Sequence, residues 1–211
     1  MLLRLVAAVM LVLMPVSVQA QEILVGRFSA GDLDGWEAKE FKGKTLYTLV
    51  ENGGRTVLKA EAAGAASGLF KKIKIDPKAN QVIQWSWKVD RVLDKGDARS
   101  KAGDDYSARV YVVFEGALFW QTTGLNYIWA NRLPKGEAVP NAFAKKNVIM
   151  LAVESGPGRV GEWVREERNV YEDYRRLFGK EPPVISAVAV MTDTDNTGET
   201  ATAWYGDIVF R

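Results

Sequence analysis

The stretch Gln81-Val-Ile-Gln-Trp-Ser-Trp-Lys-Val89 alternates strictly between apolar and polar side chains from Ile83 onward. Ile83, Trp85 and Trp87 share one face, while the polar residues between them share the other, which is the period of a strand with one buried side. We therefore expect a half-buried β-strand whose two tryptophans belong to the core.

Similar short strands, separated by turn signals, occupy most of the remaining chain. Asn52-Gly-Gly54, for example, is typical of a hairpin turn between two strands. The predicted fold class is all-β: an antiparallel, jelly-roll-like β-sandwich of about ten strands. The expected strands span residues 23–28, 45–51, 56–62, 68–75, 81–89, 106–115, 125–130, 147–154, 184–191 and 200–210.

One short α-helix is expected near residues 169–178. Val170, Tyr174 and Leu177 recur at helical spacing, which gives this segment one apolar side. Asn169 is a suitable N-cap and Gly179 a suitable stop. The helix is the one predicted interruption of the β pattern.

The first twenty residues are predicted to be a secretory signal peptide. Arg4 supplies the positive region, residues 5–14 the apolar region, and Val18-Gln-Ala20 a small-x-small cleavage site. The alternative, an uncleaved membrane anchor, is disfavoured because the apolar run is short. We expect a single mature domain, residues 21–211, in the periplasm or outside the cell.

Composition narrows the possible chemistry. The chain has no Cys and no His, which excludes disulfides, cysteine nucleophiles, Ser-His-Asp triads, histidine bases and ordinary zinc sites. Any metal must be held by oxygen ligands, as calcium or magnesium is. The formal charge of +2 falls to +1 without Arg4, so nothing indicates a nucleic-acid partner. No membrane span is expected after signal cleavage.

The segment Met191-Thr-Asp-Thr-Asp-Asn-Thr-Gly198 places Asp193 and Asp195 at the spacing of the first half of a calcium loop. Trp204 occupies the position of the distal acidic ligand, so Glu199 or Asp207 would have to substitute for it, and Asp207 in the last strand is taken as the further ligand. Calcium held by Asp193, Asp195 and Asp207 is therefore a prediction. The alternatives are a solvated β-turn for the first two and a salt bridge for Asp207.

Several polar and aromatic residues could bind a ligand. Arg109 and Tyr111 share the polar face of their predicted strand, and an aromatic ring can stack on a sugar while polar groups bind its hydroxyls. A helix N-terminus can also bind an anion or a hydroxyl. Core packing is the alternative for each aromatic residue, and capping with an internal ion pair is the alternative at the helix start. The predicted ligand-binding residues are Asp105, Arg109, Tyr111, Tyr127, Trp129, Arg168, Asn169, Asp173, Asp193, Asn196 and Tyr205.

Three blocks of sequence stand out together, namely residues 104–114, residues 168–179, and residues 191–198 followed by 204–208. Together they resemble an exported bacterial family of uncharacterised proteins, domain of unknown function 3047. The resemblance implies an exported single domain and no particular activity. The chain is also similar in architecture to jelly-roll carbohydrate-binding modules, which often end on an aromatic-Asp-Ile strand such as residues 205–208.

Three functions are compatible with these observations. The first is a domain with no catalytic residues, which binds a glycan or another component of the cell envelope and is stabilised by calcium. The second is a structural or protein-interaction domain of the envelope. The third is a glycan hydrolase or lyase that uses carboxylates, for which Glu115, Glu154, Asp173 and Asp193 could supply a pair. This function predicts that turnover is lost on changing one of Asp105, Glu154 or Asp193.

Overall fold

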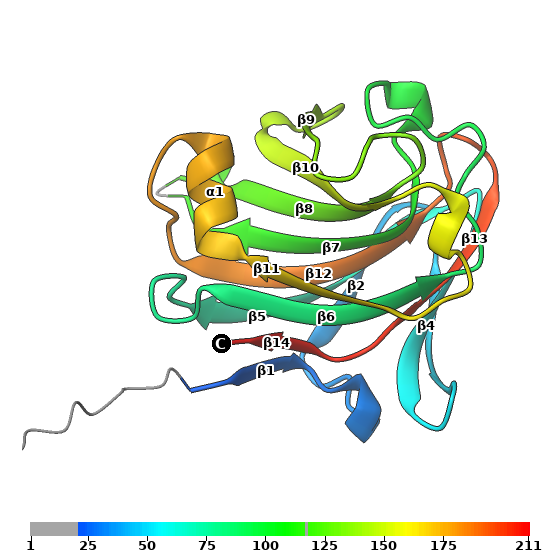
Figure 1. Ribbon diagram of the computed structural model, residues 1–211, viewed down its shortest axis with the longest axis horizontal. Coiled ribbons are helices and arrows are strands. Elements are labelled where there is room, and N and C mark those ends of the chain that lie inside the picture. The colour runs from blue at the N-terminus through cyan, green and yellow to red at the C-terminus, as the bar shows by residue number, and fades with distance from the viewer. Residues whose placement is uncertain (1–20, 117) are drawn as a thin grey trace, which may run out of the picture.

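The computed structural model describes residues 21–116 and 118–211, so the predicted signal peptide lies outside the described residues. Two seven-stranded sheets lie against each other (Figure 1). The all-β sandwich expected from the sequence is confirmed, with more strands than the ten predicted. Within the described residues, no helix is both long and apolar enough to cross a membrane.

The first sheet contains both ends of the described chain. Its strand order is β1-β14-β6-β13-β4-β3, and β11 pairs with β6. The alternating stretch near residue 85 is β6, which has neighbours on both sides. The strands are β1 (Ile23–Gly26), β3 (Leu46–Glu51), β4 (Thr56–Ala63), β6 (Val82–Val89), β11 (Val164–Asn169), β13 (Thr200–Tyr205) and β14 (Ile208–Phe210).

The second sheet has the order β2-β5-β12-β7-β8-β10-β9. Its pairs are antiparallel except for β8 and β10, which run parallel, so the expectation of a wholly antiparallel sandwich was wrong at this pair. The strands are β2 (Trp36–Lys42), β5 (Ala66–Ile75), β7 (Tyr106–Phe114), β8 (Thr123–Ala130), β9 (Ala138–Asn141), β10 (Lys145–Ser155) and β12 (Ile185–Asp193).

Aromatic side chains fill the space between the sheets. The ring of Trp85 stacks on Tyr127 with centroids 5.2 Å apart, and Trp87 lies 6.0 Å from Trp129. The prediction of Trp85 and Trp87 as core residues is confirmed. Tyr127, Trp129 and Tyr205 were expected to bind a ligand, but each is 0% exposed. This expectation is corrected, because their rings bury apolar surface between the sheets.

The single predicted α-helix is α1 (Val170–Phe178), with Asn169 as its N-cap and Gly179 after its end. The Asn169 side chain accepts a hydrogen bond from the Glu172 amide at 2.9 Å. Tyr174 packs against Phe114 at 4.4 Å between ring centroids, so the helix closes one end of the core. Short 3-10 turns are η1 (Phe28–Ala30), η2 (Lys101–Gly103), η3 (Phe119–Gln121) and η4 (Pro157–Arg159).

The outer face of the second sheet is partly covered by two connections. Residues 90–105 and 131–144 pack there around a small apolar cluster that is separate from the main core. This cluster includes Tyr106, Ile128 and Met150. The connections cover the side of the sheet near β8 and β10, and their edge borders a pocket over β7 and β12.

Candidate functional site

The Arg109 pocket is a hollow of about 430 Å³ on the outer face of the second sheet. Ala108 and Val110 point into the core, so strand alternation sends Arg109 and Tyr111 outward. This pocket is where most of the polar residues predicted on that strand and on the aspartate-rich turn meet. Its lining residues are Phe41, Lys42, Ala66, Asp104, Arg109, Tyr111, Asn141, Phe143, Met191, Asp193, Asp195 and Asn196.

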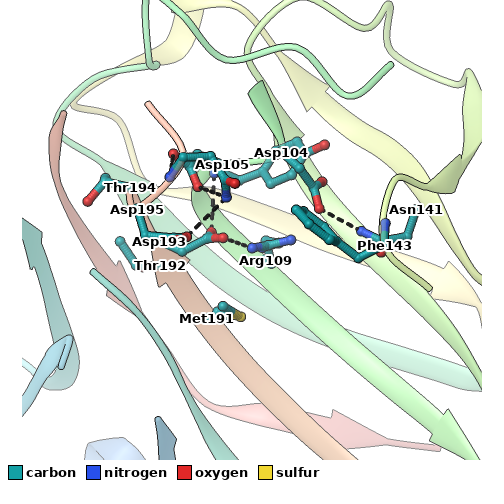
Figure 2. A network of polar contacts seen from close by, with 12 residues as sticks. Asp104, Asp105, Arg109, Asn141, Phe143, Met191, Thr192, Asp193, Thr194 and Asp195 are labelled. Atoms are coloured by element: carbon teal, nitrogen blue, oxygen red, sulfur yellow. Dashed lines mark hydrogen bonds and ion pairs between the residues drawn. The ribbon is translucent and has the colours of Figure 1, made fainter. Parts of the chain in front are cut away.

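The floor of the pocket is organised by a buried ion pair between neighbouring strands. Arg109 Nη2 on β7 contacts Asp193 Oδ2 at the end of β12, and Figure 2 shows the two side chains pointing toward each other. Asp193 Oδ1 also accepts a hydrogen bond from the Tyr106 amide at 3.2 Å. The Arg109 guanidinium lies 4.7 Å from the ring centroid of Tyr106 and 5.8 Å from that of Tyr111. The guanidinium is therefore held between two rings and one carboxylate.

Asp104 forms a second polar wall beside Arg109. Its Oδ2 accepts a hydrogen bond from Asn141 Nδ2 at 2.9 Å, which ties the start of β7 to the end of β9 (Figure 2). Burial raises the pKa of the Asp104 carboxyl, and the positive charge of Arg109 opposes that shift. Burial likewise raises the pKa of the Tyr111 hydroxyl, so this group stays a neutral hydrogen-bond donor at pH 7.

The aspartate turn (residues 193–198) is held in place by Asp105. Asp105 Oδ2 accepts hydrogen bonds from the amides of Asn196 at 2.9 Å and Thr197 at 2.6 Å. Its Oδ1 accepts a third from Asn196 Nδ2 at 3.0 Å. Asp105 is 0% exposed and does not line the pocket. It therefore acts on the site by positioning Asn196.

The carboxylates of Asp105, Asp193 and Asp195 lie within 4.8 Å of one another. Each of their six oxygens already faces an N–H group or a cation, including Lys42 at 3.7 Å from Asp195 Oδ2. Such a set fits calcium poorly, because the ion would have to displace these donors. Calcium at this cluster stays a prediction, and chelation tests it.

Asp207 is not part of this cluster. It lies between β13 and β14 in the first sheet and accepts hydrogen bonds from the amide of Ser29, at 2.8 Å, and from its hydroxyl. The expectation that Asp193, Asp195 and Asp207 converge was wrong, because β12 belongs to one sheet and the last two strands to the other. Asp207 fastens η1 to the first sheet instead.

The residues predicted at the helix start also lie elsewhere. Arg168 forms two hydrogen bonds with Asp173, at 2.9 and 2.6 Å, and Tyr127 donates to Asp173 at 3.1 Å. Asn169 caps the helix. Their expected ligand-binding role is replaced by an internal ion pair and a cap, which satisfy the groups that a ligand would have used. Glu154 also lies outside the pocket. Its carboxylate pairs with Lys135 at 3.2 Å.

Two phenylalanines at the rim were missed by the sequence analysis. Phe41 on β2 is 56% exposed, and Phe143 after β9 is 55% exposed. Phe41 lies 6.4 Å from the ring of Phe70, and Phe143 lies beside Asp104 and Asn141 in Figure 2. Neither β2 nor β9 was predicted, so neither ring could be assigned to a face. An apolar ring in the charged run of residues 37–44 was the available signal.

Solved structures with some similarity to this chain include a carbohydrate binding module and a cellulase. A family 29 carbohydrate binding module mutant complexed with mannohexaose is 12% identical, with a TM-score of 0.44 and 92% of each chain covered. A cellulase derived from Cel12A of Rhodothermus marinus is 11% identical, with a TM-score of 0.47 and coverage of 90% of this chain and 99% of that one. Cellulose induced protein Cip1 is 11% identical, with a TM-score of 0.45 and coverage of 87% and 95%.

Because these identities and TM-scores are low, the similarities carry no conclusion about the site. Among curated proteins, none matches the chain. A family model described as "Protein of unknown function (DUF3047)" matches residues 34–209, which are most of the sequence. The chain therefore belongs to this family.

Proposed function

We propose that this protein, once exported, is a non-catalytic domain that binds a glycan in the Arg109 pocket. The observation that carries the proposal is the pair of exposed rings, Phe41 and Phe143, at the rim of a pocket with a polar floor. A single exposed apolar side chain is ordinary, whereas two aromatic rings on one pocket favour a binding surface.

The chemistry of the pocket suits a sugar better than a purely apolar ligand. A pyranose has apolar C–H faces that stack on aromatic rings and hydroxyls that need both donors and acceptors. Phe41 and Phe143 provide the rings, while Asp104, Tyr111 and Asn196 provide the polar groups. Arg109 Nε has no hydrogen-bond partner among the described residues, so one buried donor remains for a ligand. The volume of about 430 Å³ lies within the range of small-molecule sites.

A binding role is favoured over hydrolysis by the use that the carboxylates already have. Asp193 is paired with Arg109, and Asp105 accepts three hydrogen bonds from the aspartate turn. Glu154 lies outside the pocket and cannot be their partner across it. A glycosidase needs one carboxyl to donate a proton and another to act as nucleophile or base, and these contacts suit neither role.

Binding to a panel of immobilised envelope and plant polysaccharides, followed by calorimetry with the best oligosaccharide, tests the proposal. Phe41→Ala and Phe143→Ala should each lower the association constant about tenfold, since each removes a stacking ring. Trp120→Ala is the matched control, because Trp120 is 59% exposed but lines a different hollow. Absence of glycan binding by the wild-type protein, or full affinity in both phenylalanine variants, would contradict the proposal. Release of new reducing ends would favour the hydrolase instead.

A further inference from the structure

A second pocket lies on the opposite side of the sandwich. Gln84 and Ser86 alternate along β6 with core residues, so they face outward from the first sheet and form the floor of a hollow of about 300 Å³. We call it the Arg55 pocket, after a residue in its wall. It shares no residue with the Arg109 pocket.

The wall of the Arg55 pocket is built from segments far apart in the sequence. Arg55 comes from the β3–β4 hairpin, Trp163 from the connection before β11, and Arg165 from β11 itself. Gly206 closes the floor, since its amide donates to the Ser86 carbonyl at 2.8 Å. A Cβ at this position would lie 2.2 Å from Ser86 Oγ, so a larger residue would force the Ser86 hydroxyl to rotate away.

Trp163 holds Arg55 in position. The Arg55 guanidinium carbon lies 4.1 Å from the centroid of the Trp163 ring, which is a close cation–π contact. The indole N–H of Trp163 donates to Asn52 Oδ1 at 3.2 Å, and Lys88 Nζ donates to the same oxygen at 2.9 Å. The guanidinium is thus oriented before any ligand arrives, which lowers the entropy lost on binding.

The two arginines of the pocket contact neutral partners and keep donors available. Arg55 Nη2 lies 3.5 Å from Ser86 Oγ, and Arg165 Nη2 lies 3.3 Å from Gln84 Oε1. A guanidinium has five N–H donors, so each arginine uses only part of its capacity in these contacts. Asp207, the carboxylate in the wall, already accepts two hydrogen bonds from Ser29. The pocket therefore presents unused donors and two positive charges, which Asp207 in the wall and nearby Glu167 partly offset.

We propose that the Arg55 pocket binds a small oxyanion group, such as a carboxylate, a phosphate or a sulfate, between Arg55 and Arg165. Planar guanidinium groups bind such anions through paired charge-assisted hydrogen bonds. The Ser86 hydroxyl provides a further donor on the floor of the same pocket. The ligand class differs from that of the Arg109 pocket, and the two sites are independent.

Isothermal titration calorimetry on the mature protein, at constant ionic strength, tests this site with inorganic phosphate, inorganic sulfate and glucuronate as separate probes. At least one probe should bind saturably, and comparison of the three identifies the preferred anion. Arg55→Gln and Arg165→Gln should each lower its association constant about tenfold or more. Arg99→Gln is the control, because Arg99 is a similarly exposed arginine that pairs with Glu137 away from the pocket.

Trp163→Leu tests the orientation of Arg55 without changing the charge, and it should weaken binding while Trp163→Phe retains part of it. Absence of saturable binding by all three probes would overturn the proposal. So would an equal loss in Arg99→Gln, which would indicate attraction to net charge alone. A loss in Phe41→Ala or Phe143→Ala would place the anion in the Arg109 pocket and equally overturn it. Thermal melts of each variant separate lost binding from lost folding.

Discussion

Arg109 on β7 and Asp193 on β12 form a buried ion pair, with side chains only 4% and 2% exposed. The pair joins adjacent strands of the second sheet directly beneath the Arg109 pocket. It therefore links the stability of the sandwich to the shape of the proposed glycan site.

Removing one partner of this pair should be strongly destabilising. Asp193→Asn removes the carboxylate that Arg109 contacts directly and leaves Asp104 as its nearest remaining countercharge, and a loss of about 3 kcal/mol in the free energy of unfolding is expected. Urea denaturation at pH 7 measures it. Asp195→Asn is the control, since its ion-pair partner Lys42 is 64% exposed and 3.7 Å away, and it should cost less than about 1 kcal/mol. Equal losses in the two variants would show that the buried Arg109–Asp193 pair contributes no more to the free energy of unfolding than the Lys42–Asp195 pair.

Replacing Asp105 should loosen the aspartate turn. Asp105→Asn keeps one acceptor oxygen but puts an NH₂ group opposite N–H donors, so at least one buried donor loses its partner. We expect a loss of about 2 kcal/mol in unfolding free energy and weaker glycan binding, because Asn196 is displaced. Asp34→Asn, at an exposed position, should change neither quantity. Unchanged stability in Asp105→Asn would refute the anchoring role.

Glu166 should make stability depend on pH. Burial, with a smaller contribution from Glu154, raises its pKa from 4.5 to about 7. The folded state therefore holds this proton between pH 4.5 and 7 while the unfolded state releases it, so the contribution of Glu166 to stability falls as pH rises through that window. Above it the ionised, buried carboxylate is disfavoured by roughly 3 kcal/mol.

Glu166→Gln should remove this dependence. Unfolding free energies at pH 4 and pH 8 should show the variant gaining stability relative to wild type at the higher pH. Glu162→Gln, whose side chain is 60% exposed, is the control and should follow the wild type. A variant with the wild-type pH profile would place the titration elsewhere.

Chelation decides the calcium prediction. Because N–H groups and cations already face the oxygens of Asp105, Asp193 and Asp195, we expect EDTA to leave the melting temperature of the purified protein unchanged. Metal analysis of the same sample is the direct control. A drop in melting temperature that added calcium reverses, and that Asp195→Asn abolishes, would restore calcium to this cluster.

The sequence predicted those helices and strands that are determined by the pattern of their own neighbouring residues. The alternation of residues 82–89 and the cap and stop around α1 are properties of neighbouring residues, so β6 and the helix were predicted almost to their ends. β2, β9 and β11 carry polar residues or Pro140, and they form because a neighbouring strand offers hydrogen-bond partners. That information lies in distant parts of the chain.

The candidate site was predicted only in part, because some of its contacts join distant parts of the chain. Strand periodicity named Arg109 and Tyr111 as candidates and turn chemistry named Asp193 and Asn196, and the structure brings these four residues to one pocket. Tyr127 was not, because β8 is buried on both faces and alternation cannot distinguish them. Asp207 is close to Asp193 in sequence, yet the chain crosses from one sheet to the other between them.

The parallel pairing of β8 and β10 has a consequence for how the binding surface can vary. Two strands that run in the same direction require a connection that returns to the starting end of the sheet. Residues 131–144, which include the edge strand β9, form this connection. This connection places Asn141 and Phe143 at the pocket and contributes only Ala138 to the edge of the main core. Substitutions at residues 141–143 of this connection can therefore alter ligand preference while the packing of the sandwich stays the same.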